Sequence, residues 1–438
     1  MGELRRSLGL GSLSFYGVGL IVGAGIFSIL GEAAGIAGEA LWMSFLVGSV
    51  AALLTGLSYA ELATMFPKAG AEYVYVCEAW PRMSWLPGTL GWVLVIAGVA
   101  MNATVALAFA GYASRFVAAP TWLIAGTLVA VAVALNVVGV NEASWANVVF
   151  TLIEVGGLVA LIVVGARDPD FGRIFTATPH AGVLGAAGLI FFAYLGFEGI
   201  ANFAEEAKRP GRDMPRAILG AVAVSTVLYV LVAAAGVALL EPARLAGSAS
   251  PLADAMEEGA PRLAGALGGI ALFATANTAL ISITVASRIL FGMARGGDAP
   301  PRLAATLARR NTPAAAILVA GLGALIFLPL GGIGLVGSVA SFLALVAFAS
   351  VNAALIRLRR TRPEMERPFR VPLDLRRVPV LAALGLLVVV VLSTQFEVKT
   401  YGIAAAALAI AFVTQAVPWV QVDAEGRGSP DGRETPHR

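Results

Sequence analysis

Charged and chemically reactive side chains are scarce in this chain of 438 residues. Only 13% of the residues are Asp, Glu, Lys or Arg, and the chain contains one cysteine, Cys77, and two histidines, His180 and His437. A single cysteine excludes an internal disulfide and a cysteine-based metal site. The sequence has no H-E-x-x-H, G-x-S-x-G or Walker motif. We therefore expect no metal and no cofactor, and we disfavour an enzyme because no nucleophile and base stand near each other.

Hydrophobic sequence fills the chain instead. Hydrophobic residues make up 58% of it, and many apolar runs reach the length of about 20 residues that a helix needs to cross a bilayer. These runs predict an all-α membrane protein with twelve transmembrane helices in one domain, residues 1–420. The expected helices are residues 12–37, 41–66, 83–112, 121–140, 145–166, 182–206, 215–240, 263–295, 313–331, 334–358, 378–394 and 399–420. Residues 421–438 are polar, with Gly and Pro, and are expected to be a disordered cytoplasmic tail.

The distribution of basic residues indicates the orientation of the chain. Most Lys and Arg fall in the segments on the same side as the N-terminus, including eight arginines in residues 357–377. By the positive-inside rule, both termini of this multi-pass protein are cytoplasmic and its place is the plasma (inner) membrane. The basic loop is interpreted as a topology signal, with binding to anionic lipid as the weaker alternative. The net charge of +3 gives no reason to expect a nucleic-acid partner.

Two of the expected helices carry glycines at mid-span. Gly23 and Gly25 flank Ala24 in the first, "GLIVGAGIFSILG", and Gly196 and Gly199 flank Glu198 in the sixth. Glycines in membrane helices often serve close packing, but clustered glycines also allow a helix to unwind where its backbone faces a cavity. Broken helices at positions 1 and 6 of twelve are typical of transporters built from a five-plus-five inverted repeat.

Broken helices offer a site made of backbone. The amide groups that begin the second half of such a helix carry partial positive charge and receive a carboxylate. The carbonyl groups that end the first half receive an ammonium group. One zwitterion satisfies both without a charged side chain, which agrees with the few charges in these spans and predicts an amino acid substrate.

Four segments resemble the amino acid–polyamine–organocation (APC) superfamily of permeases: "GVGLIVGAGIF", "YAELATMFPKAGAEYVYV", "FFAYLGFEGIANFAEEAKRPGRDMPRAI" and "NTALISITVASRILFGMARGG". The chain is most similar to bacterial and archaeal amino acid permeases, some of which are similar to cationic amino acid transporters. The resemblance implies ten core helices within about residues 12–358 and two peripheral helices within about residues 378–420. It implies that the substrate carboxylate meets the amides of Ala24, Gly25 and Ile26, and that the amine meets carbonyls near Ile21, Val22, Phe192, Ala193 and Leu195. Gly23 is also a predicted substrate-binding residue.

The same resemblance makes Phe192 an aromatic gate over the substrate, with simple packing as the alternative. Polar side chains in other spans are candidates to line the side-chain pocket or an ion site, although membrane hydroxyls often bond only to their own backbone. These candidates are Asn102, Glu198, Asn277, Thr278, Ser282 and Ser341.

Glu154 lies about midway along the fifth expected helix. An ionised carboxylate there costs a few kcal/mol unless it is paired or faces water, roughly 2.5–3.5 kcal/mol for a charged side chain at the helix centre. We therefore expect Glu154 to take up and release a proton, so that transport is coupled to protons, with sodium less favoured. The alternative is a neutral, hydrogen-bonded Glu154 that holds helix 5 to helix 8.

The sequence thus predicts a secondary active amino acid transporter that works by alternating access. An amine or polyamine permease and an amino acid exchanger remain the alternatives. Polyamines lack a carboxylate and call for several acidic groups, whereas only Glu154 and Glu198 are expected to lie deep. The sequence leaves the oligomeric state open.

Overall fold

The computed structural model of the protein describes residues 8–67, 71–139, 144–204, 206–307 and 312–416. The predicted disordered tail, residues 421–438, lies outside the described residues.

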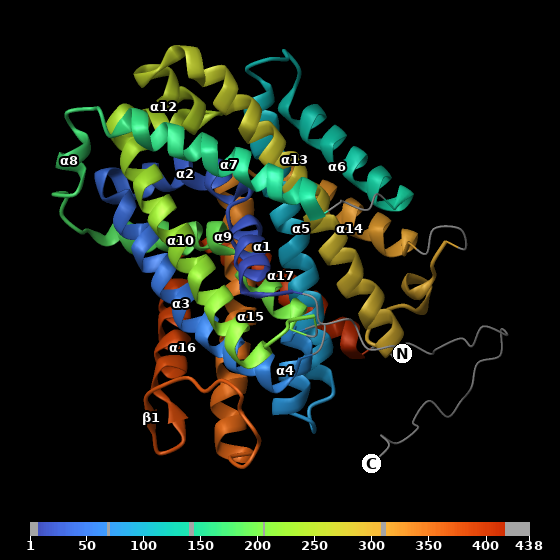
Figure 1. Cartoon of the computed structure of the whole chain (residues 1–438). Coiled ribbons are helices and arrows are strands. Elements are labelled where there is room, and N and C mark those ends of the chain that lie inside the picture. Colours follow the sequence, from blue (N-terminus) through green and yellow to red (C-terminus); the bar gives the residue numbers. More distant parts are fainter. Residues whose placement is uncertain (1–7, 68–70, 140–143, 205, 308–311, 417–438) are drawn as a thin grey trace.

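Helices account for most of the described chain (Figure 1). In the first half they are α1 (Leu10–Ile21), α2 (Ala24–Ala37), α3 (Leu41–Met65), α4 (Ala71–Ala79), α5 (Trp85–Ala113), α6 (Thr121–Val138), α7 (Ser144–Gly165), α8 (Phe171–Ile174) and α9 (Ala181–Tyr194). In the second half they are α10 (Pro210–Leu239), α11 (Pro242–Gly247), α12 (Pro251–Gly259), α13 (Pro261–Gly296), α14 (Ala314–Phe327), α15 (Ile333–Thr361), α16 (Val380–Ser393) and α17 (Val398–Ala416). Short 3-10 segments are η1 (Gly38–Ala40), η2 (Phe197–Phe203), η3 (Pro301–Ala304) and η4 (Leu328–Leu330).

The helices lie where the hydrophobic runs predicted them. Within the described residues, nine helical stretches are long and apolar enough to cross a membrane, and three shorter apolar helices, α1, α14 together with η4, and α16, accompany them. The prediction of an all-α membrane protein is therefore confirmed, while the number of twelve spans stays a prediction. Four helices from α10 to α13 begin with proline, whose fixed φ suits the first helical turn and whose missing amide costs no hydrogen bond there.

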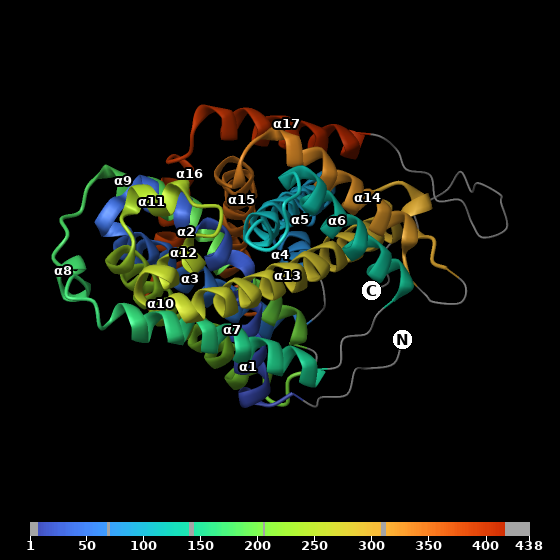
Figure 2. The same cartoon turned by 90° about the horizontal axis from the view of Figure 1, so that it is seen from above.

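Burial separates inner helices from outer ones. In α5, and in the stretch from α9 through η2, 72% of the most apolar window is buried, whereas the share is 22% in α6 and α17. Figure 2 shows α17 along one edge of the molecule with α5 and α15 inside it. Exposed Leu, Val and Ile side chains cover the outer helices, and they are the surface that the bilayer would solvate.

Several short elements between the long helices were not predicted. They are α4, the pair α11 and α12, and a two-stranded antiparallel hairpin of β1 (Asp374–Leu375) and β2 (Val378–Pro379). Arg376 and Arg377 form the two-residue turn of the hairpin with φ of 49° and 67°. A two-residue turn with positive φ at both positions matches the right-handed twist of the strands, but it usually contains Asn or Gly.

The hairpin belongs to the basic loop, which is tied to the bundle by a buried ion pair. Glu61 of α3 is fully buried, and its two oxygens accept bonds from Nε and Nη2 of Arg359 at 2.7 and 2.5 Å. Arg367 donates to the same carboxylate at 3.1 Å, and the amide of Val371 donates at 2.8 Å. Asp374 accepts from the remaining nitrogen of Arg359 at 2.7 Å. The buried carboxylate of Glu61 therefore accepts hydrogen bonds from two guanidinium groups and one backbone amide.

The start of the chain is joined to the segment after η2. The amide of Leu8 donates to the carbonyl of Glu206 at 3.0 Å, and the amide of Lys208 donates to the carbonyl of Leu8 at 2.9 Å. In addition, the rings of Tyr16 in α1 and Phe203 in η2 pack edge to face, with centroids 4.8 Å apart. The beginning of the chain and α1 are therefore linked to η2 and the residues after it by two separate sets of contacts.

Arg359→Met tests the buried ion pair. Removing one partner leaves Glu61 with incomplete compensation, and breaking a buried pair in this way costs about 3–5 kcal/mol. We expect a clearly lower melting temperature of the purified protein in detergent. Arg302→Met is the control, because Arg302 is exposed, and it should melt like the wild type. Equal melting temperatures of the two variants would contradict the structural role of the pair.

Candidate functional site

The first interruption separates α1 from α2. α1 ends at Ile21, and the amide of Gly23 folds back to donate to the carbonyl of Ile21 at 2.8 Å. Val22 between them has φ −79° and ψ 60°, which is the geometry of an inverse γ-turn. The break predicted at Gly23–Gly25 is therefore present and is centred on Val22 and Gly23. Ala24 and Gly25 already belong to the first turn of α2.

The second interruption separates α9 from η2. α9 ends at Tyr194, and Gly196 adopts φ of +121°, which side chains with a Cβ rarely adopt. The amide of Gly196 donates to the carboxylate of Glu198 at 2.9 Å. Glu198, predicted as a pocket or ion-site residue, here caps the unwound backbone.

The two interruptions lie against each other. A Cβ added at Gly196 would clash with the carbonyl oxygen of Leu20 in α1, and one added at Gly25 would lie 2.7 Å from the Cα of Ala193 in α9. These two glycines therefore permit a backbone-to-backbone approach between the breaks. Residues predicted from both helices, among them Ile21, Gly25 and Ala193, meet in one place.

A tyrosine spans the carbonyl ends of both broken helices. The hydroxyl of Tyr229 in α10 lies 2.7 Å from the carbonyl oxygen of Ile21 and 3.1 Å from that of Ala193. Its ring packs against Phe45 and Tyr194, with centroids 5.7 and 5.6 Å away. These carbonyls are among the groups predicted to receive an ammonium group. In this structure both carbonyls lie within hydrogen-bond distance of the single hydroxyl proton of Tyr229.

Sequence reasoning missed Tyr229. The signal that points to it is its position inside the apolar span "STVLYVLVAAAG", where a phenol hydroxyl requires a hydrogen-bond partner. The sequence does not show which backbone groups become that partner, since Ile21 is 208 residues away.

The amide end of the first interruption is only partly occupied. The amide of Ala24 donates to Oγ1 of Thr278 in α13 at 3.1 Å, so Thr278, predicted as a candidate to line the pocket or an ion site, contacts the first break. The first amides of a helix have no partner within it, and the described residues supply no acceptor for those of Gly25 and Ile26. Ser28 donates to the carbonyl of Ala24 at 2.7 Å. Two adjacent amides thus remain at the positive end of α2.

Glu154 lies deep on α7, with 3% of its surface exposed. α7 packs against α1, α10 and α13, and Glu154 lies near enough to Tyr229 for electrostatic interaction. Among the described residues, no basic side chain interacts with it. The structure therefore places Glu154 next to the helix that holds both carbonyl ends.

The other predicted residues form separate contacts. Nδ2 of Asn102 donates to the carbonyl of Ala279 at 2.7 Å and to Oγ of Ser282 at 2.8 Å, while its buried Oδ1 has no partner in the described part of the chain. Ser341 donates to the carbonyl of Leu189 in α9 at 3.2 Å. Phe192 is buried within α9, and Asn277 is half-buried on α13. The Phe192 carbonyl accepts from the Leu195 amide at the second interruption at 3.3 Å, whereas the hydrogen bonds found among the described residues for Asn102, Ser282 and Ser341 do not involve the residues of the breaks.

A second acidic residue lies close to Glu198. Glu72 of α4 is buried and accepts a hydrogen bond from the Tyr59 hydroxyl at 2.9 Å. Burial raises the pKa of the Glu72 carboxyl. Glu72 and Glu198 are near enough to interact electrostatically, so the segment that follows the second break meets α4.

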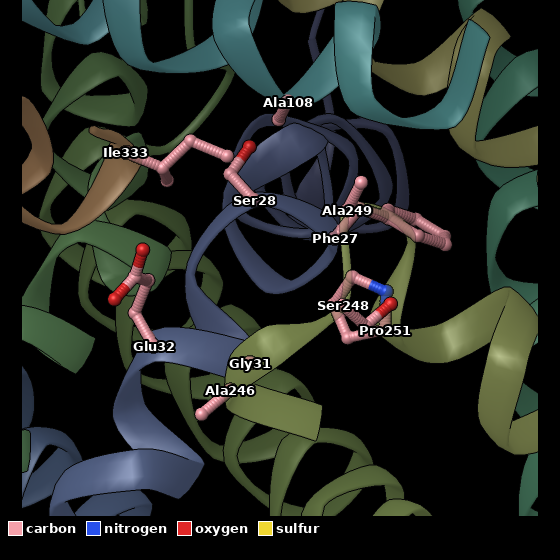
Figure 3. Close-up of a pocket in the computed structure, with 10 residues that line it drawn as sticks. All are labelled: Phe27, Ser28, Gly31, Glu32, Ala108, Ala246, Ser248, Ala249, Pro251 and Ile333. Atoms are coloured by element: carbon pink, nitrogen blue, oxygen red, sulfur yellow. The ribbon is translucent and has the colours of Figure 1, made fainter. Parts of the chain in front are cut away.

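On the other side of the break, a small cavity of about 20 Å³ lies between α2 and the α11–α12 segment (Figure 3). Phe27, Ser28 and Glu32 line it from α2. The α11–α12 segment contributes Ala246, Ser248, Ala249 and Pro251. A Cβ at Gly31 or Gly35 of α2 would press on this segment, so those glycines serve packing. A cavity of this size holds about one water molecule. The cavity is therefore too small for an amino acid.

Adjoining helix interruptions with opposed backbone ends inside a membrane bundle are typical of secondary transporters. The sequence matches the amino acid permease family over residues 8–421. The chain therefore belongs to this family within the APC superfamily, as its motifs indicated. It is thus a multi-pass membrane transporter and not an enzyme.

Named relatives cover most of this chain. It is 28% identical to the branched-chain amino acid permease BcaP of Bacillus subtilis, over 88% of this chain and 87% of the relative. It is 30% identical to the glutamate/serine transporter AimA of the same species, over 88% and 76%. It is 29% identical to a methylthioribose transporter, also of Bacillus subtilis, over 84% and 85%.

Gly25→Ala tests the close approach of the two interruptions. The added methyl group has to displace the α9 backbone at Ala193, and overpacking of this kind costs about 1–3 kcal/mol, so the melting temperature should fall. Gly220→Ala is the matched control, since nothing lies within 4 Å of a Cβ there and alanine favours a helix. A Gly25→Ala protein that melts at or above the Gly220→Ala protein would contradict the contact.

Proposed function

We propose that this permease is a secondary active amino acid transporter that works by alternating access. The observation that carries the proposal is the meeting of the two interruptions, where amides of Gly25 and Ile26 and carbonyls of Ile21 and Ala193 point to one zwitterionic ligand. The carboxylate would bind the amides at the positive end of α2. The ammonium group would take the carbonyls that Tyr229 serves in this structure. Val22, Gly23, Ala24 and Leu195 shape the breaks.

The proposed architecture has twelve spans, with ten core helices in a five-plus-five inverted repeat and α16 and α17 at the periphery. Residues 1–420 form one transport domain. Both termini are cytoplasmic, and the protein resides in the plasma membrane. Support comes from the basic loop, which lies at the end of α15, and from the low burial of α17.

In this scheme the structure is closed toward the cavity beside α2. The α11–α12 segment has to move before an amino acid can pass from that side, because the cavity holds about one water molecule. Phe192 acts as the gate from α9. Asn102, Asn277, Thr278, Ser282, Ser341 and Glu198 are the proposed lining of the side-chain pocket or an ion site.

The relatives carry different cargo by name: branched-chain amino acids, glutamate or serine, and methylthioribose. An amino acid is favoured for this chain because its free amides call for a carboxylate. The prediction that only Glu154 and Glu198 lie deep is wrong, because Glu61, Glu72 and Asp213 are also buried. A polyamine is disfavoured because it would leave the free amides of Gly25 and Ile26 without an anion, and because the buried Glu61 is neutralised by Arg359. An exchanger would share the same binding site and would differ only in requiring substrate on both sides.

Recognition of the two backbone ends predicts which ligands stabilise the purified protein. A free amino acid that is a substrate should raise the melting temperature, since a ligand at 100 times its Kd adds about 2.7 kcal/mol. Its methyl ester and its N-acetyl derivative each lose one charged end and should give little or no shift. Screening the amino acids, these derivatives and putrescine by thermal shift checks this. Stabilisation by putrescine or by the esters alone would overturn the proposal.

Coupling to protons is proposed through Glu154. Its carboxyl group is buried without a basic partner among the described residues and interacts electrostatically with Tyr229, which contacts both broken helices. Protonation of Glu154 would therefore alter the electric field at the residue that bonds to both carbonyl ends. Because an unpaired anion in the bilayer is costly, loading and release of the proton would follow the opening of the site to water.

Glu154→Gln tests this role, because it retains the shape and the hydrogen bonding of the side chain while removing titration. In proteoliposomes with an inward proton gradient, the variant should bind substrate but lose gradient-driven accumulation. Glu241→Gln, an exposed carboxylate, is the control and should accumulate substrate like the wild type. Full accumulation by Glu154→Gln would remove Glu154 from coupling, and a strict sodium requirement of the wild type would replace the proton.

A further inference from the structure

An open groove lies on the surface where the basic loop meets α16. Its volume is about 530 Å³, and none of the residues that line it belongs to α1, α2, α9 or η2. The residues that line it come from the end of α15, from the hairpin and from the first turns of α16. They are Arg360, Leu375, Arg376, Val378, Val380, Ala383, Leu384 and Leu387.

One wall of the groove is a continuous apolar stripe on α16. Val380, Ala383, Leu384 and Leu387 follow the spacing i, i+3, i+4, i+7, which places them on one face of a helix. Leu384 and Leu387 expose 43% and 57% of their surface, while the opposite face of α16 packs on α15 and α3. In a membrane-spanning bundle, an outward apolar stripe of this kind contacts acyl chains.

The end of the groove at the hairpin is basic and uncompensated. Arg360 and Arg376 are exposed, and no acidic side chain among the described residues forms an ion pair with either. Their neighbours in the same loop differ, since Arg359, Arg362 and Arg367 each contact a glutamate. Arg357 and Arg377 also form no ion pair with the described residues, and Arg360 and Arg376 are the unpaired arginines that line the groove.

The backbone at this end is strained. Arg376 and Arg377 both have positive φ, at 49° and 67°, in a turn that Asn-Gly would form at lower cost. Strained backbone persists where the surroundings hold it and is frequent at ligand clamps. Here the turn position that Asn or Gly would usually occupy is taken by Arg376, whose side chain lines the basic end of the apolar groove.

We propose that this groove binds an anionic phospholipid of the leaflet next to the basic loop. The phosphate group lies between Arg360 and Arg376, which suits the planar guanidinium groups, and an acyl chain follows the stripe of α16. A free phosphate ion would use the arginines alone and would leave the stripe without a role. Basic pockets beside transmembrane helices on the cytoplasmic side bind lipid head groups by the same electrostatics.

The first experiment compares head groups and charges by native mass spectrometry of the purified protein with phosphatidylglycerol or phosphatidylcholine. The wild type should bind phosphatidylglycerol more tightly. Arg360→Gln combined with Arg376→Gln should weaken that binding about thirtyfold, from about 1 kcal/mol for each basic residue near the surface. Arg82→Gln combined with Arg302→Gln removes two other exposed charges and should change it little. Equal binding of both lipids by the wild type, or equal loss in both double variants, overturns the proposal.

The second experiment separates a lipid from a free phosphate. Ala383→Trp fills the apolar part of the groove without altering charge, and it should reduce phosphatidylglycerol binding at least tenfold. Inorganic phosphate added in excess should not displace the lipid from the wild type. Unchanged lipid binding by Ala383→Trp, or displacement by inorganic phosphate, shows that the arginines alone make the site and refutes the lipid assignment. The head-group comparison on the wild type holds whether or not a variant folds.

Discussion

The structure depends on finding partners for the backbone groups that two helix interruptions release inside an apolar bundle. An unpaired amide or carbonyl in hydrocarbon costs several kcal/mol, so neighbouring side chains satisfy most of the backbone groups that the interruptions release. Tyr229 serves the carbonyls of Ile21 and Ala193, Thr278 accepts from Ala24, and Glu198 accepts from Gly196. The helices α10 and α13 therefore stabilise the breaks, because their side chains bond to the released backbone groups.

Much of this fold is readable from the sequence. Apolar runs predict the long helices to within a few residues, since the bilayer demands a minimum length and the polar or proline-rich segments end each run. The glycine pairs predict where two helices stop. Gly196 in particular has a backbone conformation that other residues avoid, so its type alone carries structural information.

The partners at the breaks are not readable in the same way. Tyr229 and Ile21 are 208 residues apart, and Glu61 and Arg359 are 298 apart. Hydropathy and local spacing describe each helix alone, whereas these bonds depend on which helices pack together. The prediction that the Ala24, Gly25 and Ile26 amides act as one group also missed that Thr278 takes the first of them. The short elements α4, α11 and α12 escaped notice because they are too short for a periodic pattern.

The pairing of Leu8 with residues 206 and 208 has a mechanical consequence. Through these two hydrogen bonds and the Tyr16–Phe203 contact, α1 and η2 are linked although they lie far apart in the sequence. If α1 moves, η2 has to move with it unless these contacts break. α1 and η2 thus form one rigid unit, and the two interruptions are the positions about which this unit can rotate relative to α2 and α9.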